Sequence, residues 1–190
     1  MNMILNRERK KAVVANRVNY ESWPLDCLAN YIEKLQRKTV TDTSKVIFQS
    51  IRLVRSYRAA QNNILSELEK LFTEMVSRLS VHMRKEEQHL FPFIREMMLA
   101  KEINRNINRQ ALERIAWLID KLKEEHSVEK KDLQLSAKLR ENYLAVVDVS
   151  RPVSKLLTAL IDFEQGCELH IRLQNTLLFP TIIALRYDVF

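Results

Sequence analysis

Two histidine segments of the sequence share one unusual frame. They read HMRKEEQHLFP at residues 82–92 and HIRLQNTLLFP at residues 170–180, so both fit His-x3-[Glu/Gln]-x3-Leu-Phe-Pro. Residues four apart on a helix are neighbours on one face, so His82 projects beside Glu86 and His170 beside Gln174. A single histidine on an apolar face is more often a hydrogen-bonded core residue. The repeated Leu-Phe-Pro tail favours two halves of one site instead.

A third histidine completes a candidate metal-ligand set. His126 lies midway between His82 and His170 in the sequence, on a separate helical stretch. Side chains from facing helices build metal sites in the cores of helical bundles, so His82, Glu86, His126 and His170 are the predicted ligands. Imidazole and carboxylate suit iron, manganese or zinc, and these ligand types alone do not choose among the three metals.

The fourth histidine is predicted to lie outside this site. His89 follows Glu86 by three residues, the Glu-x-x-His spacing of di-iron bundles, but the sequence has no second such pair. It also lies about 10 Å along a helix from His82, too far to share one ion. We therefore interpret His89 as a boundary residue.

The composition predicts an all-α protein. One glycine and four prolines among 190 residues leave little material for hairpin turns. Four amphipathic stretches with short connections predict an antiparallel four-helix bundle. Their predicted extents are Ser22 to about 60 with a pause at 41–44, about 62 to 101, about 106–134 followed by a polar passage at 135–150, and Ser150 into the second histidine segment. Pro92 and Pro180 predict a kink or an end of their helices.

Charge and cysteine usage bound the class of protein. The net charge is +7, and the densest basic run, RERKK at 7–11, falls in a segment (1–21) predicted to be loosely ordered before a bundle at 22–190. Basic and acidic residues are mixed elsewhere, so nucleic-acid binding is the weakest of our hypotheses. Cys27 and Cys167 are typical of reduced, packing cysteines. With neither a signal-peptide pattern nor an apolar run of membrane-spanning length, the sequence predicts a cytoplasmic protein.

Four segments of the chain resemble the hemerythrin-like (HHE cation-binding) family, and within it the repair-of-iron-centres proteins. They are WPLDCLANYI (23–32), HMRKEEQHLFPFI (82–94), KEEHSVEKKDL (123–133) and HIRLQNTLLFP (170–180). The resemblance runs from about residue 22 to the C-terminus and does not include the cysteine-containing N-terminal domain of many members. It implies a four-helix bundle in which five histidines and two bridging glutamates hold a non-haem di-iron centre. It also implies oxygen or nitric oxide handling and the repair of damaged iron–sulfur centres.

The ligand set implied by this resemblance is incomplete. His82, Glu86, His126 and His170 match family ligands. Three other positions are degraded: Arg37 stands where a first-helix histidine is expected, preceded by Gln36; Arg58 stands at a second; and Gln174 replaces a bridging glutamate. Because arginine cannot coordinate a cation and an amide is a weak ligand, a di-iron centre is not expected.

The direction of the two arginines leaves three outcomes open. If Arg37 and Arg58 point inward, they place fixed positive charge in the pocket, or a guanidinium takes the place of the ion against Glu86. If both extend outward along their stems, the three histidines and Glu86 remain for one ion.

Two functions follow from these outcomes. The first is a divergent hemerythrin-like protein that holds one non-haem metal ion, such as iron, or none. Its expected partner is a small diatomic ligand at the open positions of that ion, or a damaged iron–sulfur protein. The alternative is a metal-free regulatory or protein-interaction bundle in which Arg37, Arg58 and Gln174 replace the metal site. No nucleophile or phosphate-binding pattern supports other enzyme chemistry.

Overall fold

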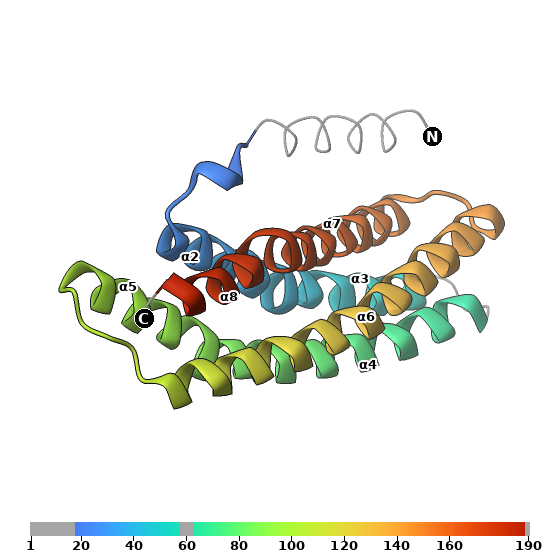
Figure 1. Cartoon of the computed structure of the whole chain (residues 1–190). Coiled ribbons are helices and arrows are strands. Elements are labelled where there is room, and N and C mark those ends of the chain that lie inside the picture. Colours follow the sequence, from blue (N-terminus) through green and yellow to red (C-terminus); the bar gives the residue numbers. More distant parts are fainter. Residues whose placement is uncertain (1–17, 58–62, 189–190) are drawn as a thin grey trace.

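The computed structural model describes residues 18–57 and 63–188, which form four antiparallel helical rods joined by short connections (Figure 1). The prediction of an all-α four-helix bundle is confirmed. The first rod is α2 (Leu25–Gln36), η2 (Arg37–Thr43) and α3 (Ser44–Tyr57); the second is α4 (Asn63–Lys85), η3 (Glu86–Leu90) and α5 (Phe91–Glu102); the third is α6 (Arg109–Val146); and the fourth is α7 (Arg151–Leu173), η4 (Gln174–Leu178) and α8 (Phe179–Asp188).

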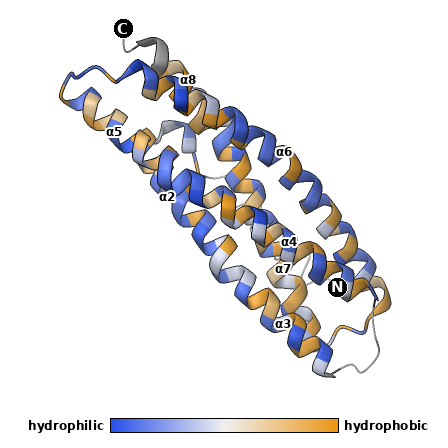
Figure 2. Ribbon diagram, turned by 90° about the horizontal axis from the view of Figure 1, so that it is seen from below, coloured by the Kyte–Doolittle hydropathy of each residue, from blue (hydrophilic) through white to orange (hydrophobic). Residues whose placement is uncertain are grey.

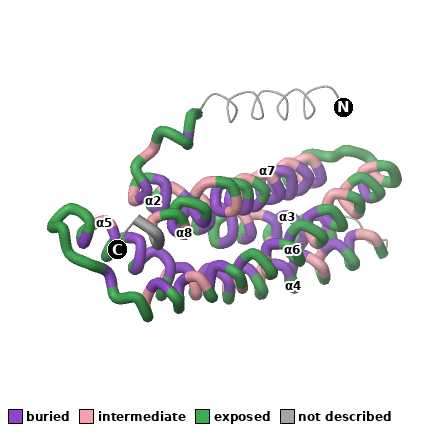
Figure 3. Tube along the Cα trace, in the orientation of Figure 1, coloured by how far each residue is buried: buried purple, intermediate pink, exposed green. Residues whose placement is uncertain are grey.

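Each rod packs against two others, and the first rod closes the bundle against the fourth. The packed pairs are α2 with α5, α4 with α6, α6 with α7, and α3 with α7. Figure 3 shows the buried residues facing the middle of the bundle and the exposed ones facing solvent, and Figure 2 shows hydrophobic and hydrophilic residues alternating along each helix. Among the described helices, none combines the length and the apolar character needed to cross a membrane.

A short 3-10 helix, η1 (Tyr20–Ser22), precedes the first rod. The Tyr20 ring is buried and lies 5.1 Å from the Trp23 ring and 5.4 Å from the Tyr31 ring, measured between centroids. Tyr20 therefore belongs to the bundle core, although it falls in the predicted N-terminal segment. The RERKK run of that segment lies outside the described residues.

The hydrophobic core is divided into two clusters. One gathers residues of α2, α5, the first half of α6 and α8, including Ile32 and Phe91. The other gathers residues of α3, α4 and α7, including Phe72 and Phe163. Buried polar residues, among them His126, interrupt the apolar side chains between the two clusters. The bundle therefore carries a polar layer with apolar packing on either side of it.

Both histidine segments contain the same local irregularity, a π-helical turn just before the proline. In η3 the Phe91 N–H donates to the Glu86 carbonyl, and in η4 the Phe179 N–H donates to the Gln174 carbonyl, five residues back in each case. Such turns are often found at functional sites. The sequence predicted a kink or an end at each proline, and neither rod ends there. Each proline lies in the first turn of the helix that follows, where its missing N–H is tolerated. The predicted pause at 41–44 lies at a third π-helical segment, η2.

The third rod is longer than the sequence predicts. The expected polar passage at 135–150 is helical as far as Val146. Its inward-facing stripe looked polar because it includes Ser136 and Arg140, and both bind Glu164 of α7: Ser136 Oγ donates at 2.9 Å and Arg140 Nη2 lies at 3.1 Å. A helix face that buries polar groups against a polar partner gives no apolar periodicity.

Candidate metal centre

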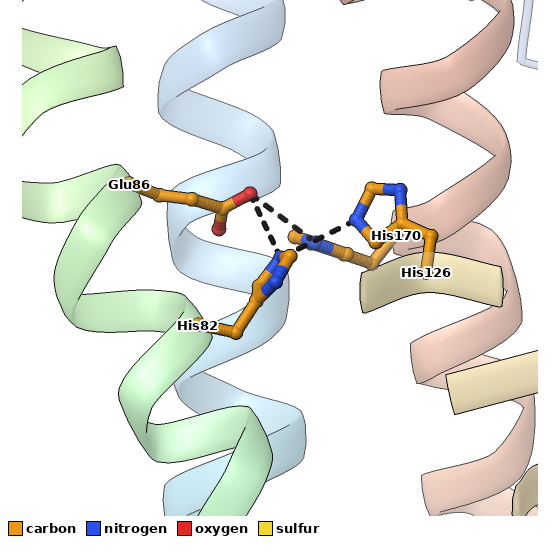
Figure 4. A group of neighbouring side chains, drawn as sticks. All are labelled: His82, Glu86, His126 and His170. Atoms are coloured by element: carbon orange, nitrogen blue, oxygen red, sulfur yellow. Dashed lines mark hydrogen bonds and ion pairs between the residues drawn. The ribbon is translucent and has the colours of Figure 1, made fainter. Parts of the chain in front are cut away.

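Three histidines and one glutamate from three rods converge in the polar layer. One ligand atom from each of His82, Glu86, His126 and His170 lies within 4.8 Å of the corresponding atoms of the other three (Figure 4). His82 Nε2 lies 3.1 Å from Glu86 Oε1 and 3.3 Å from His126 Nε2, and His170 Nε2 lies 3.7 Å from Glu86 Oε1. All four residues are buried. The structure thus brings together the four residues that the sequence proposed as ligands.

The second histidine segment contributes Gln174 to the same layer. Gln174 is fully buried, and its side-chain Nε2 donates to Glu86 Oε1 at 2.5 Å. Glu86 and Gln174 each open a π-helical turn, so the two halves of the repeated frame meet across the bundle. A carboxylate in one half is matched by an amide in the other.

Two outer residues orient the histidine rings. Glu125 accepts a hydrogen bond from His82 Nδ1 at 2.9 Å, and Asn175 Oδ1 accepts one from His126 Nδ1 at 3.0 Å. A proton fixed on Nδ1 leaves Nε2 directed toward the centre, and this kind of support tunes metal ligands. The sequence analysis missed both residues. The only signal in the sequence was their position: Glu125 directly precedes His126, and Asn175 directly follows Gln174.

The centre balances its charge around Glu86. Burial opposes the charged form of this carboxyl, but the neighbouring imidazole of His82, then that of His170, hold its pKa well below the usual range. Burial likewise opposes charge on His82, yet ionised Glu86 and the hydrogen bond to Glu125 raise the pKa of His82. Without metal, His82 is therefore an imidazolium paired with a carboxylate.

The other two histidines are neutral. Burial, followed by the charge on His82, lowers the pKa of His126 to about 3. Burial lowers the pKa of His170 to about 4, although Glu86 acts in the opposite direction. A neutral imidazole is the form that binds metal, so these two residues need lose no proton when an ion arrives.

The side chains of the centre fit a single cation. Glu86 Oε2, His170 Nε2 and Gln174 Oε1 are buried and have no hydrogen-bond partner among the described residues. Unsatisfied buried polar groups are rare in folded proteins and call for an explanation such as an ion or a water. An imidazole nitrogen and a carboxylate oxygen are the donors that iron, manganese or zinc would take up.

The first rod shows the direction of Arg37, which the sequence left open. Arg37 points out of the bundle: its side chain is 61% exposed and pairs with Glu33 at 3.4 Å and with Glu87 at 3.2 Å. The preceding residue, Gln36, is the one that faces inward, at 2% exposed. Arg37 therefore places no charge in the centre and replaces no ligand there. Arg58 lies outside the described residues.

His89 and the two cysteines are not members of the candidate ligand group. His89 is exposed, in agreement with its interpretation as a residue outside the site. Cys27 is exposed and Cys167 is buried, and both are free thiols.

A surface groove reaches the centre between α4 and α6. Its volume is about 280 Å³, and it is lined by Ser77, Arg78, Val81, His82, Glu125, Val128 and Glu129. Burial raises the pKa of Glu129 to about 7, against the opposing effect of charged His82. Because His82 is both a groove residue and a candidate ligand, a small molecule in the groove would lie next to the centre.

The comparisons with known proteins agree with this geometry. The family model of the hemerythrin HHE cation-binding domain matches residues 45–182, which include all four candidate ligands. A comparison with curated proteins found no similar sequence.

Proposed function

Starting from the fact that the chain belongs to the hemerythrin HHE cation-binding family, we propose that it binds one non-haem metal ion, iron, through His82, Glu86, His126 and His170. The observation that carries this proposal is the convergence of four buried ligand atoms within 4.8 Å. The unpartnered Glu86 Oε2 and His170 Nε2 support it, because both belong to the proposed ligands.

One ion suits the charges of the site better than two. Glu86 is the only carboxylate among the four proposed ligands, and the amide of Gln174 stands opposite it. Buried cations without anionic partners cost several kcal/mol each, so a second ion would lack compensation. Gln36, the inward-facing residue of the first rod, also offers an amide.

The surrounding residues prepare the ligands and control access. Glu125 and Asn175 hold His82 and His126 with Nε2 toward the centre. The Nε2 proton of His82 must leave when a metal binds, while the Nδ1 proton stays in its hydrogen bond to Glu125, a residue about one-third exposed at the groove. An iron ion held here would supply open positions for a small diatomic ligand such as oxygen or nitric oxide, together with redox chemistry.

We further propose a cellular role on the strength of the family resemblance. The protein would act in oxidative or nitrosative stress in the cytoplasm, with a damaged iron–sulfur protein as its partner. The groove between α4 and α6 supports the small-ligand part of this role, since its wall includes a proposed metal ligand. The two free thiols suit a reducing compartment.

Metal titration tests the proposal. Metal-free protein, titrated anaerobically with Fe(II), should bind one equivalent, and His170→Ala should abolish binding. His89→Ala is the matched control, because this histidine is exposed and outside the group. Wild-type protein that takes up no more iron than the His170→Ala variant would refute a metal-binding function.

The metal-free alternative rests on one observation. Glu86 already accepts a hydrogen bond from Gln174 and pairs with the His82 imidazolium, so the centre is neutral without an ion. In this reading the network serves a regulatory or protein-interaction bundle. Arg37 has no part in it, because that side chain is exposed. The reading predicts iron uptake only after Gln36→His and Gln174→Glu are introduced together.

A further inference from the structure

A second, smaller cavity lies behind the metal centre. It has a volume of about 10 Å³, and its walls include Gln36, Leu79, His82, Glu129 and His170. A volume of this order holds a single water molecule, provided that polar groups surround it. It is too small for any ligand of several heavy atoms.

Several polar atoms of the cavity walls have no partner. Gln36 Nε2 and Oε1, Glu129 Oε2 and His170 Nδ1 are all buried without a hydrogen bond from any described residue. Each belongs to a residue that lines this one cavity. Buried donors and acceptors that are left unpaired are costly, and their concentration around a water-sized space indicates what fills it.

The three histidines of the centre differ in how their outer nitrogen is held. His82 Nδ1 has Glu125 as its acceptor, and His126 Nδ1 has Asn175. His170 Nδ1 has none among the described residues, although His170 Nε2 faces the centre like the others. The small cavity lies against this third ring.

We propose that the small cavity binds one water molecule, and that Gln36 acts through this water as a positioning residue for His170. The water accepts a hydrogen bond from His170 Nδ1–H and is held in turn by the amide of Gln36 and by Glu129. His170 is thereby fixed in the tautomer that leaves its Nε2 lone pair free. The water site stands on the cavity and on the unpartnered atoms around it, while its consequence for metal binding rests on the proposed function.

The packing of the first and fourth rods keeps Gln36 in this position. A Cβ atom added at Gly166 would lie 2.3 Å from Thr39 Oγ1 and 2.8 Å from Thr39 Cγ2. Only glycine allows η2 to approach α7 this closely, and both Thr39 and Gly166 line the cavity. The close approach thus sets a wall of the water site.

The tautomer of His170 can be measured without any metal. We expect the ring ¹⁵N chemical shifts of the metal-free protein to show His170 protonated at Nδ1 in the wild type. Gln36→Met, which keeps the side-chain length but removes the amide, should give a mixture of the two tautomers at His170 and leave His126 unchanged. Leu79→Met, at an apolar wall of the same cavity, is the control and should keep the wild-type spectrum.

A crystal structure of the metal-free wild type gives an independent measurement, with a single ordered water expected in the cavity. An empty cavity there, or a Gln36→Met variant with the wild-type His170 tautomer, would overturn the proposal. The search for the water uses the wild-type protein, so it does not depend on whether a Gln36 variant folds.

Co(II) affinity separates this proposal from the proposed function. Loss of Gln36 should weaken Co(II) binding by about 10–100-fold, the usual effect of removing an outer partner of a metal-bound histidine. If wild-type protein binds no Co(II), the proposed function fails while the tautomer and the water still report on the cavity. If Co(II) binds the wild type and Gln36→Met equally well, the positioning role of Gln36 is wrong.

Discussion

The amide of Gln174 offers the sharpest test of the charge balance at the centre. Gln174 Nε2 donates to Glu86 Oε1 at 2.5 Å, and both residues are fully buried. Gln174→Glu replaces this donor with a second carboxyl group of nearly the same shape. Two carboxylates at this separation cannot both ionise, so the pair must keep one proton. Because burial lowers the pKa of His170 to about 4, we expect the proton to remain on a carboxyl rather than on that ring.

The magnitude follows from the cost of holding that proton. An ordinary glutamate has a pKa of about 4.3, and keeping it protonated costs about 1.4 kcal/mol for each pH unit above this value. The proton itself restores a hydrogen bond between the two groups. We therefore expect the metal-free Gln174→Glu variant to be less stable than wild type by about 3–4 kcal/mol at pH 7 and by about 1 kcal/mol at pH 5.

Urea unfolding in the presence of a chelator measures both values. Gln174→Met is the control: it also loses the hydrogen bond to Glu86, but its loss of stability should not depend on pH. With metal, the order should reverse, because the added carboxylate becomes a ligand and bound metal stabilises the folded state by mass action. A pH-independent loss for Gln174→Glu, or no gain in its metal affinity, would refute the reasoning.

Three further outcomes follow from other parts of the molecule. Burial opposes charge on His82, but the carboxylates around it raise its pKa to about 10, so a metal must displace its proton. Calorimetry at several pH values should therefore show the apparent metal affinity rising about tenfold per pH unit between pH 6 and 8. An affinity that does not change with pH would show that His82 is neutral. Gly166→Ala drives a methyl group into Thr39, and thermal unfolding should show a loss of about 1–3 kcal/mol; unchanged stability would mean that η2 moves away freely. Arg140→Met leaves buried Glu164 without its cation and should lower the free energy of unfolding, measured with urea, by about 3–5 kcal/mol at pH 8. The loss should be smaller at pH 5, because burial raises the pKa of Glu164 and a protonated carboxyl tolerates burial. Equal losses at both pH values would contradict this.

The sequence was sufficient for the fold class and for the four candidate ligands. Helical periodicity places residues four apart on one face, so the frame shared by the two histidine segments already directed His82 and Glu86 toward the same side. The structure places these side chains, with His126 and His170, around one point. Local spacing carries this information because it does not depend on which helices become neighbours.

The boundaries of α6 were less accessible to sequence reasoning. Ser136 and Arg140 face inward, but as polar residues they resemble a loop or a solvated face. Only Glu164, on another rod, makes their burial favourable. A pattern read along one helix cannot reveal a polar partner that another helix supplies.

The first rod shows the remaining division most clearly. Adjacent helical residues differ in direction by about 100°, so whether Arg37 or Gln36 faces the centre depends on the phase of one helix. The sequence determined that neither Gln36 nor Arg37 is the histidine expected from the family resemblance. The four rods would assemble around a polar layer whichever of the two residues faced inward. The packing of α2 and η2 against α7 decided that Gln36 turns inward while Arg37 meets solvent and the carboxylates of Glu33 and Glu87. The physical reason is that side-chain direction at a rod's π-helical segment is set by contacts between helices, which no local pattern encodes.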